Sequence, residues 1–281
     1  KENNIMANSA YGSGINLDAM VVPVQAATVF AAQENSLYLP GLLIPSVEVP
    51  AGSASAQVAV MGSVTAASIS AEAAPGVDFE TLLPSDTKKT IALDLLAART
   101  VLRDLGGIDT NDMGRIMGNA IASKVDALVS AQLGALTAQE ATTNLLDEMY
   151  EAIGTIRAAG ETGPLNCVVS AAAYQGFMTV IGSSAFAGGE TQNAAMRSGF
   201  IGMIAGTPCY VSSHLNDTNT GLTNTKFAVF SGDALRMAMQ GGVNVEVERR
   251  AAAVGNDIVA SAAFGVDVID ATRGVVVQDA A

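Results

Sequence analysis

The spacing of apolar residues along the chain predicts one long helix near its middle. Between residues 109 and 136, apolar side chains recur three or four positions apart, as they do on one face of a helix. About 25 residues at roughly 1.5 Å each make a rod of about 37 Å. Asp109 or Thr110 is placed to cap its first turn. The predicted apolar face consists of Met113, Ile116, Met117, Ala120, Ile121, Val125, Leu128, Val129 and Leu133.

Two glycines, Gly114 and Gly118, interrupt this helix. Each costs about 1 kcal/mol relative to alanine in an exposed helix. Close approach of another backbone explains why a helix would keep them. We therefore expect a second segment to pack against this face.

The rest of the pattern predicts interleaved shorter helices and strands. A helix at 20–34 would carry Pro23 in its first turn, where the missing N–H does no harm. Asn144 and Ser170 are suited to begin two further helices, and Gly160 to end the first of them. No regular βαβ repeat emerges, which indicates an α+β protein. These helices span 145–159 and 171–181, and strands are expected at 165–170, 226–231, 243–249, 257–269 and 274–278.

Residues 53–87 have the pattern of a long β-hairpin, with the returning strand at 87–100. Its side chains are small or β-branched and few are charged. An isolated two-stranded hairpin is barely stable, so we expect this one to lie on something else. A flexible Ala/Ser linker is the alternative, and the apolar residues of the segment disfavour it. Those residues, the candidate contacts between subunits, are Val58, Val60, Met61, Ile69, Phe79 and Leu82.

The first 19 residues are rich in Asn, Ser and Gly, which is typical of a mobile arm. Lys1 is a poor residue to follow an initiator Met. We expect either proteolytic trimming of a precursor or a truncated start, with Met6 as the alternative start.

Composition limits the classes of function. Hydrophobic residues make up 49% of the chain and charged residues 15%, yet no stretch has the roughly 20 predominantly apolar residues of a bilayer-crossing helix. We expect no membrane partner and extensive contact between subunits. The net charge is −13 with only 14 Lys and Arg, so the basic surface that grips nucleic acid is absent.

The chain offers few groups for chemistry. Its single histidine, His214, lies among Ser212, Ser213 and Asp217, but such close neighbours in sequence rarely converge into a triad. There is no nucleophile elbow, dinucleotide fingerprint or phosphate-binding loop. We expect no catalytic, cofactor or metal site and no enzyme activity. Cys167 and Cys209 are predicted to be buried free thiols, and the pairs Asp147/Glu148 and Glu246/Glu248 to lie on solvated faces.

Several motifs, in this order, resemble those of the major capsid proteins of tailed double-stranded DNA phages, which share the Hong Kong 97-type fold. "KVDALVSAQLGAL" is similar to the end of their spine helix, and "NCVVSAAAYQGFM" to their axial-domain segment, departing at Ala171 or Ala172, where proline is frequent. "GFIGMIAGTPCYVSSHLND" follows the family pattern closely, with Gly206 and Pro208 turning into an edge strand. "GVDVIDATRGVVV" is similar to the family's last hairpin.

The resemblance implies an architecture. It divides the chain into an N-terminal arm at 1–45, an extended hairpin loop at 46–97, a peripheral domain with the spine helix at 98–141, an axial domain at 142–239, and closing strands of the peripheral domain at 240–281.

The resemblance also implies a function. Such proteins self-assemble as pentamers and hexamers into an icosahedral shell that encloses double-stranded DNA, with scaffolding, portal and cementing proteins as further partners. The implied location is the virion, after assembly in the host cytoplasm. An encapsulin-like compartment of the same fold is one alternative. A secreted surface-layer protein or adhesin is another, which the missing signal peptide and repeats disfavour.

The hairpin bears on how such a shell is held together. One branch of the family links subunits through a lysine on the extended loop, and 53–87 contains no lysine. Lys88 and Lys89 are expected at the base of the hairpin. We therefore expect subunits to be held without covalent links.

Overall fold

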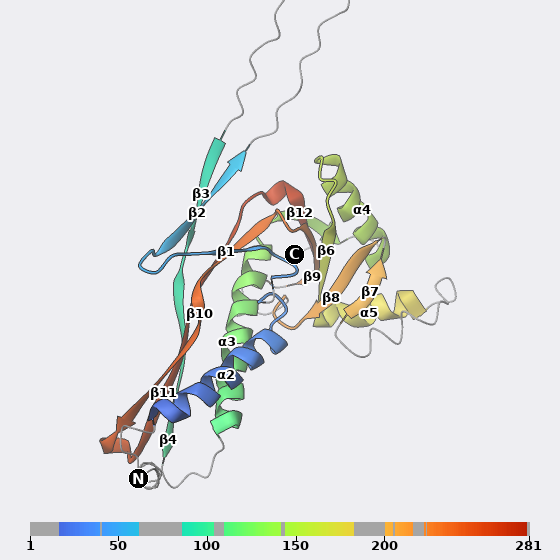
Figure 1. Cartoon of the computed structure of the whole chain (residues 1–281). Coiled ribbons are helices and arrows are strands. Elements are labelled where there is room, and N and C mark those ends of the chain that lie inside the picture. The colour runs from blue at the N-terminus through green and yellow to red at the C-terminus, as the bar shows by residue number, and fades with distance from the viewer. Residues whose placement is uncertain are drawn as a thin grey trace, which may run out of the picture.

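Two β-sheets, each lined by helices, form the body of the protein, and a two-stranded ribbon projects from it (Figure 1). The α+β prediction is confirmed. The ribbon pairs β2 (Ser55–Met61) with β3 (Asp86–Ala92). The computed structural model describes residues 17–39, 41–61, 86–103, 110–141, 144–182, 200–204, 206–215, 222 and 224–279.

The first sheet is long and has four strands. Its central strands are antiparallel and run for 16 and 14 residues. Valines and polar residues alternate along the first of them, so Val243 and Val245 are buried while Glu246 and Glu248 face solvent. The prediction of a solvated face for these two glutamates is confirmed. In order across the sheet, the strands are β1 (Ser46–Glu48), β10 (Leu235–Arg250), β11 (Gly255–Val268) and β4 (Asp94–Arg103), and the 3₁₀ turn η3 (Ala251–Ala253) joins β10 to β11.

The predicted long helix is present as α3 (Thr110–Leu133). It runs alongside the four-stranded sheet (Figure 1). The buried residues of its apolar stripe form one core cluster with those of the sheet. Two predicted members of the stripe are wrong: Ile116 is 62% exposed, and Ala120 is also exposed. Both lie across the helix from Gly118, where a second helix packs, so the buried face is rotated toward the glycines from the face that the spacing suggested. The buried members are Met113, Met117, Ile121, Val125, Val129 and Leu133.

The second helix is α2 (Leu17–Asn35), and it meets α3 at the two glycines. A Cβ atom on Gly118 would lie 2.4 Å from the carbonyl oxygen of Thr28, and one on Gly114 would lie 2.8 Å from the Cβ of Ala27. Side chains larger than hydrogen do not fit there without movement of the backbone. The predicted close approach is confirmed.

The start of α2 differs from the prediction. The helix begins at Leu17, so Pro23 lies in its second turn and lacks the N–H that an interior residue donates. Residues 17–19, expected in the arm, are helical, and residues 1–16 lie outside the described part. Packing against α3 compensates for the lost hydrogen bond, because most helix stability in proteins comes from tertiary contacts.

The second sheet has six strands and mixed directions. Helices α4 (Leu145–Ala158) and α5 (Ala171–Gly182) pack on it. The rings of Phe177 and Phe227 meet edge to face in this core, with centroids 5.4 Å apart. In order, the strands are β5 (Thr137–Ala141), β12 (Gly274–Asp279), β9 (Thr225–Ser231), β6 (Leu165–Ser170), β8 (Thr207–Ser212) and β7 (Phe200–Ile204).

Two predictions about these strands are wrong. β12 does not form a hairpin with β11: the turn η4 (Ala271–Arg273) carries the chain to the other sheet, where β12 pairs with β5 and β9. The strand after Gly206 is not an edge strand either, because β8 lies between β6 and β7. Pro208 is tolerated since the parallel ladder with β6 begins at Cys209.

The predicted helix caps are confirmed where the structure describes them. The side chain of Asn144 accepts hydrogen bonds from two backbone N–H groups of α4, and Gly160 follows the helix with φ +92°. Ser170 Oγ accepts from the N–H of Ala173. Asp147 is exposed, but Glu148 is buried, so a solvated face was wrong for it. Glu148 lies beside Met149 on the buried stripe of α4.

Candidate assembly surface

The ribbon is the described part of the predicted hairpin. Its strands pair in register from Ser55 with Ala92 to Met61 with Asp86. Of the six candidate contact residues, Val58 and Val60 are half-buried, and Met61 is described by its backbone alone. The remaining three, Ile69, Phe79 and Leu82, fall in 62–85, outside the described residues.

The base of the ribbon is docked on its own subunit. Ala56 and Ile91 are buried against Ala238 of β10, and Val58 packs beside Ile269. This small apolar cluster satisfies the expectation that the hairpin would not stand alone. It also means that the inner side of the ribbon near its base is already covered by its own chain.

A single glycine allows the ribbon to cross the four-stranded sheet. A Cβ atom on Gly265 of β11 would lie 2.1 Å from the carbonyl oxygen of Ala92. Leu93, directly after the ribbon, donates its N–H to Ala54 O at 3.0 Å. This hydrogen bond joins the two chain segments at the point where the ribbon crosses the sheet. The backbone of the ribbon therefore rests directly on β11.

Gln240 holds the turn that precedes the ribbon, a role that no sequence pattern indicates. Its Nε2 donates to the carbonyls of Pro50 at 2.8 Å and Ser53 at 3.2 Å. Gln240 sits where β10 and β11 lose register, next to Gly241 with φ +65°. The irregularity in β10 thus carries a contact to the loop.

Both strands of the ribbon carry uncovered side chains. Gln57, Ala59, Lys88 and Lys89 are all exposed. The lysines pair with Ala59 and Val58, within three pairs of the docked pair of Ala56 with Ile91, and so lie near the base as expected. An uncovered two-stranded ribbon with small side chains gains little stability from its own contacts.

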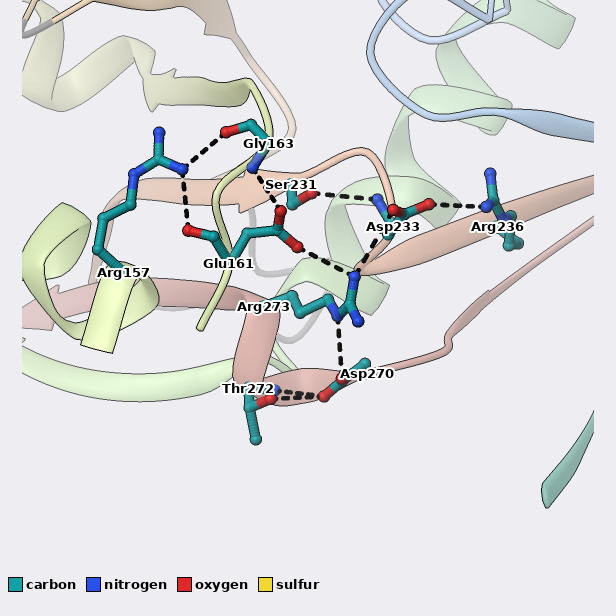
Figure 2. A network of polar contacts seen from close by, with 9 residues as sticks. All are labelled: Arg157, Glu161, Gly163, Ser231, Asp233, Arg236, Asp270, Thr272 and Arg273. Atoms are coloured by element: carbon teal, nitrogen blue, oxygen red, sulfur yellow. Dashed lines mark hydrogen bonds and ion pairs between the residues drawn. The ribbon is translucent and has the colours of Figure 1, made fainter. Parts of the chain in front are cut away.

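A polar network joins the connections on which the ribbon rests to the six-stranded sheet (Figure 2). We call it the crossover network, and it consists of Glu161, Asp233, Arg236, Asp270 and Arg273. Burial pushes the pKa of Asp270 up, but hydrogen bonds from Thr272 and Arg273 hold it below its usual range. No local sequence pattern indicates this network, because its members lie in three separate connections and at the start of β10.

His214 lies at a strand end, as predicted, in a cavity of about 590 Å³ between α3 and β8. Its ring Nε2 is 3.2 Å from Ser123 Oγ, and its backbone N–H donates a hydrogen bond to Ser212 Oγ. Asp217 falls outside the described residues. Among the residues that the structure describes, no group of three His, Cys, Asp or Glu is placed to hold a metal ion.

Asp126 of α3 lines the same cavity and forms hydrogen bonds with the segment that follows α2. Its carboxylate accepts hydrogen bonds from Ser36 Oγ at 2.5 Å and from the N–H of Leu37 at 3.0 Å. Burial raises the pKa of Asp126, and these two hydrogen bonds with the nearby His214 oppose the rise. Asp126 falls on the buried side of the predicted helix, and this unusual place for a carboxylate was the signal in the sequence that pointed to such a contact.

Asp126→Asn should flatten part of the pH dependence of stability. A raised pKa means that the folded state holds a proton that the unfolded state, with a pKa of about 3.9, has released. Wild-type stability contributed by this group is complete below about pH 3.9 and is lost as the pH rises through the folded pKa. Urea unfolding of both proteins between pH 3.5 and 7 measures the difference. Parallel curves would contradict the assignment.

The two cysteines are buried in adjacent strands, in register with each other. The prediction of buried free thiols is confirmed. Burial, with Cys209 next to it, raises the pKa of the Cys167 thiol, so little reactive thiolate forms there.

In the described chain, no helix combines the length and the apolar character needed to cross a bilayer.

Comparison with known proteins identifies the fold. No family model matches the sequence, and no curated protein matches it. Solved structures do match. A structure of Mycobacterium phage Che8 is 20% identical, covers 80% of this chain and 84% of its own, and superposes with a TM-score of 0.61. The capsid of cyanophage P-SCSP1u is 17% identical over 85% of this chain and 86% of its own, with a TM-score of 0.63. The chain has the Hong Kong 97-type capsid fold.

This fold is shared by a third match, a virus-like particle from Pyrococcus furiosus. It is 12% identical, covers 90% of this chain and 96% of its own, and has a TM-score of 0.61. The capsid fold is therefore confirmed across nearly the whole chain, whereas identities at this level specify no residue's role.

Proposed function

We propose that this chain is the major capsid protein of a tailed phage, and that it self-assembles into an icosahedral shell around double-stranded DNA. The observation that carries the proposal is the capsid fold together with a ribbon that projects from the body and has exposed side chains on both strands. A second copy of the chain is the partner that this geometry suits. The role is structural, and no enzyme activity is part of it.

The exposed apolar side chains support contact with several neighbours. They come from α2, α3, β4, α4, β7 and two loops, so they are spread along the molecule. Shell subunits need thin contacts on many sides, and such contacts leave apolar side chains on several elements of a lone subunit. The exposed large apolar residues are Phe30, Leu42, Leu95, Val101, Ile116, Tyr150, Met203 and Val254.

We also propose a division of the elements into domains. We assign the four-stranded sheet with α3 to the peripheral domain and the six-stranded sheet with α4 and α5 to the axial domain, in which β12 then belongs. The arm is 1–45, and the extended loop is the part of 46–97 that lies between β1 and β4. Scaffolding, portal and cementing proteins are partners of the assembled shell in this proposal, which places the protein in the virion after assembly in the host cytoplasm.

Electron microscopy of the purified full-length protein tests the proposal. Closed icosahedral shells are expected, and discrete small oligomers alone would overturn it. Shells that protect double-stranded DNA from nuclease when purified from infected cells separate a phage capsid from a protein compartment of the same fold.

Shells should be held without covalent links between subunits. Residues 53–87 contain no lysine, and Lys88 and Lys89 pair near the base of the ribbon. The two cysteines are buried within the subunit. Boiled in detergent, shells are expected to give one band at the monomer mass of 28.5 kDa. A ladder of resistant multimers would contradict this, and Lys88→Arg with Lys89→Arg would then show whether these amines form the links.

A further inference from the structure

The two sheets are joined where the ribbon is seated. Residues 232–234 lead from β9 to β10, and residues 269–273 lead from β11 to β12, so both connections pass from one sheet to the other. The N–H groups of Ile269 and Asp270 both bond to Ala234 O, at 2.8 and 3.2 Å. The connections are therefore fastened to each other.

Arg273 extends this junction to a third segment. Figure 2 shows its guanidinium at the centre of the crossover network. Its Nη1 lies 3.0 Å from Glu161 Oε2 and 3.6 Å from Asp233 Oδ2, and its Nε lies 3.2 Å from Asp270 Oδ2. Glu161 belongs to the loop between α4 and β6, in the six-stranded sheet. One side chain thus bridges three segments that belong to both sheets.

Glu161 is also held in place by contacts other than the one with Arg273. Its side chain is only 8% exposed, and its other oxygen accepts from the N–H of Gly163 at 2.7 Å. Arg157, at the end of α4, donates to the backbone carbonyls of Glu161 and Gly163 at 2.9 and 2.8 Å. The loop that presents the carboxylate is therefore tied to α4.

The ribbon meets the same network from its other side. Val58, Ala59 and Val60 of β2 line a cavity of about 170 Å³ together with Asp233, Arg236, Ile269, Asp270 and Arg273. Val58 also packs in the apolar cluster that includes Ile269. The ribbon's orientation thus depends on where the 269–273 connection is held.

We propose that Arg273 is a positioning residue for assembly: it fixes the orientation of the ribbon relative to the six-stranded sheet by holding the connection on which the ribbon rests. The inference rests on the proposed function, in which the ribbon contacts a second copy. Arginine suits the role because its planar fork bonds to several carboxylates at once, whereas lysine presents one compact charge.

Hydrogen–deuterium exchange of the unassembled full-length chain tests the positioning. In Arg273→Ala, amides of 55–61 and 86–92 are expected to exchange about tenfold faster, which corresponds to roughly 1.4 kcal/mol of local opening. Arg99→Ala is the matched control: Arg99 is also an exposed arginine paired with an aspartate, Asp257, but farther along β4. Equal ribbon exchange in the two variants would overturn the inference.

A second variant separates positioning from the cost of an unpaired charge. Removing Arg273 alone leaves the nearly buried Glu161 carboxylate without its partner, which by itself destabilises the fold. The pair Arg273→Ala with Glu161→Gln removes that charge, and the fast exchange of the ribbon is expected to remain. Recovery of slow exchange in this double variant would show that Arg273 has only a structural role. Arg273→Lys should fall between the wild type and Arg273→Ala.

Shell formation is read separately. Arg273→Ala is expected to lower the yield of closed shells at least fivefold, and Arg99→Ala to leave it unchanged. If the wild type forms no shells, the proposed function fails, while the exchange data still decide whether Arg273 orders the ribbon. If shells form and ribbon exchange is the same in Arg273→Ala as in wild type, the positioning inference alone fails.

Discussion

Gly118→Ala is expected to destabilise the subunit by about 1–3 kcal/mol, even though alanine is the better helix former. The added methyl carbon would lie 2.4 Å from the carbonyl oxygen of Thr28 and 2.8 Å from the Cβ of Ala31. Both atoms belong to α2, and one is backbone, so a side-chain rotation cannot relieve the clash. Either α2 moves away from α3, or the local helix distorts. Thermal and urea unfolding of the two proteins measure the loss.

Gly154→Ala is the matched control. Gly154 is also in a helix, α4, but no heavy atom lies within 4 Å of the Cβ it would gain. There the substitution should stabilise the protein by roughly 0.5–1 kcal/mol, because alanine loses less backbone freedom than glycine. The prediction is therefore a difference in sign between two identical substitutions. Two stabilised variants would mean that α2 does not pack on this face.

Gly118→Leu should have a larger effect on both folding and assembly. A branched side chain at this point displaces α2 from the face of α3, and the segment after α2 is tied to α3 through Asp126. If that segment shifts, β1 is expected to shift with it, and β1 pairs with β10 at the base of the ribbon. An unchanged shell yield would show that packing on this face of α3 is not needed for assembly.

Local signals in the sequence were sufficient for much of the fold. The period of α3, the cap at Asn144 and the left-handed Gly160 each depend on a few neighbouring residues. The two helix glycines predicted a close partner for the same reason, since their cost is local. That the partner is α2 depends on contacts between distant segments, and no local pattern specifies it.

The errors share a physical origin. The resemblance implied that β12 forms the last hairpin with β11, but its valines suit any buried strand, and pairing with β5 and β9 selects the sheet that it joins. Glu148 reads as solvated because acidic residues favour a helix start, while the tertiary contacts of α4 place it on the buried side. In both cases tertiary structure overrode a correct local preference.

The candidate surface was predicted in outline. The hairpin follows from its small, weakly charged, β-branched pattern, and its dependence on other contacts follows from the marginal stability of two strands. The surface on which the ribbon rests does not follow, because Gly265, Gln240 and Arg273 come from β11, β10 and the connection to β12. Each reads alone as an ordinary residue, and only the fold brings them to the ribbon.

Removing residues 62–85 should abolish closed shells while leaving a folded subunit. Met61 and Asp86 pair in register across the ribbon, so an Asn-Gly turn inserted between them can close the shortened hairpin. The docked base, with Ala56 and Ile91 buried, stays intact. Circular dichroism and unfolding midpoint should therefore match those of the wild type, and electron microscopy should show no closed particles.

A full-length control distinguishes loss of apolar contacts from loss of length. Ile69→Ser, Phe79→Ser and Leu82→Ser together keep every backbone atom of the segment but remove three apolar side chains. Burying such side chains against a neighbour is worth roughly 1.5–3 kcal/mol each, and every subunit of a shell would lose all three. This variant is expected to fail in assembly as the deletion does. Wild-type shell yield from the deletion would remove residues 62–85 from the assembly surface, whereas wild-type yield from the triple variant alone would show that the segment acts through its backbone.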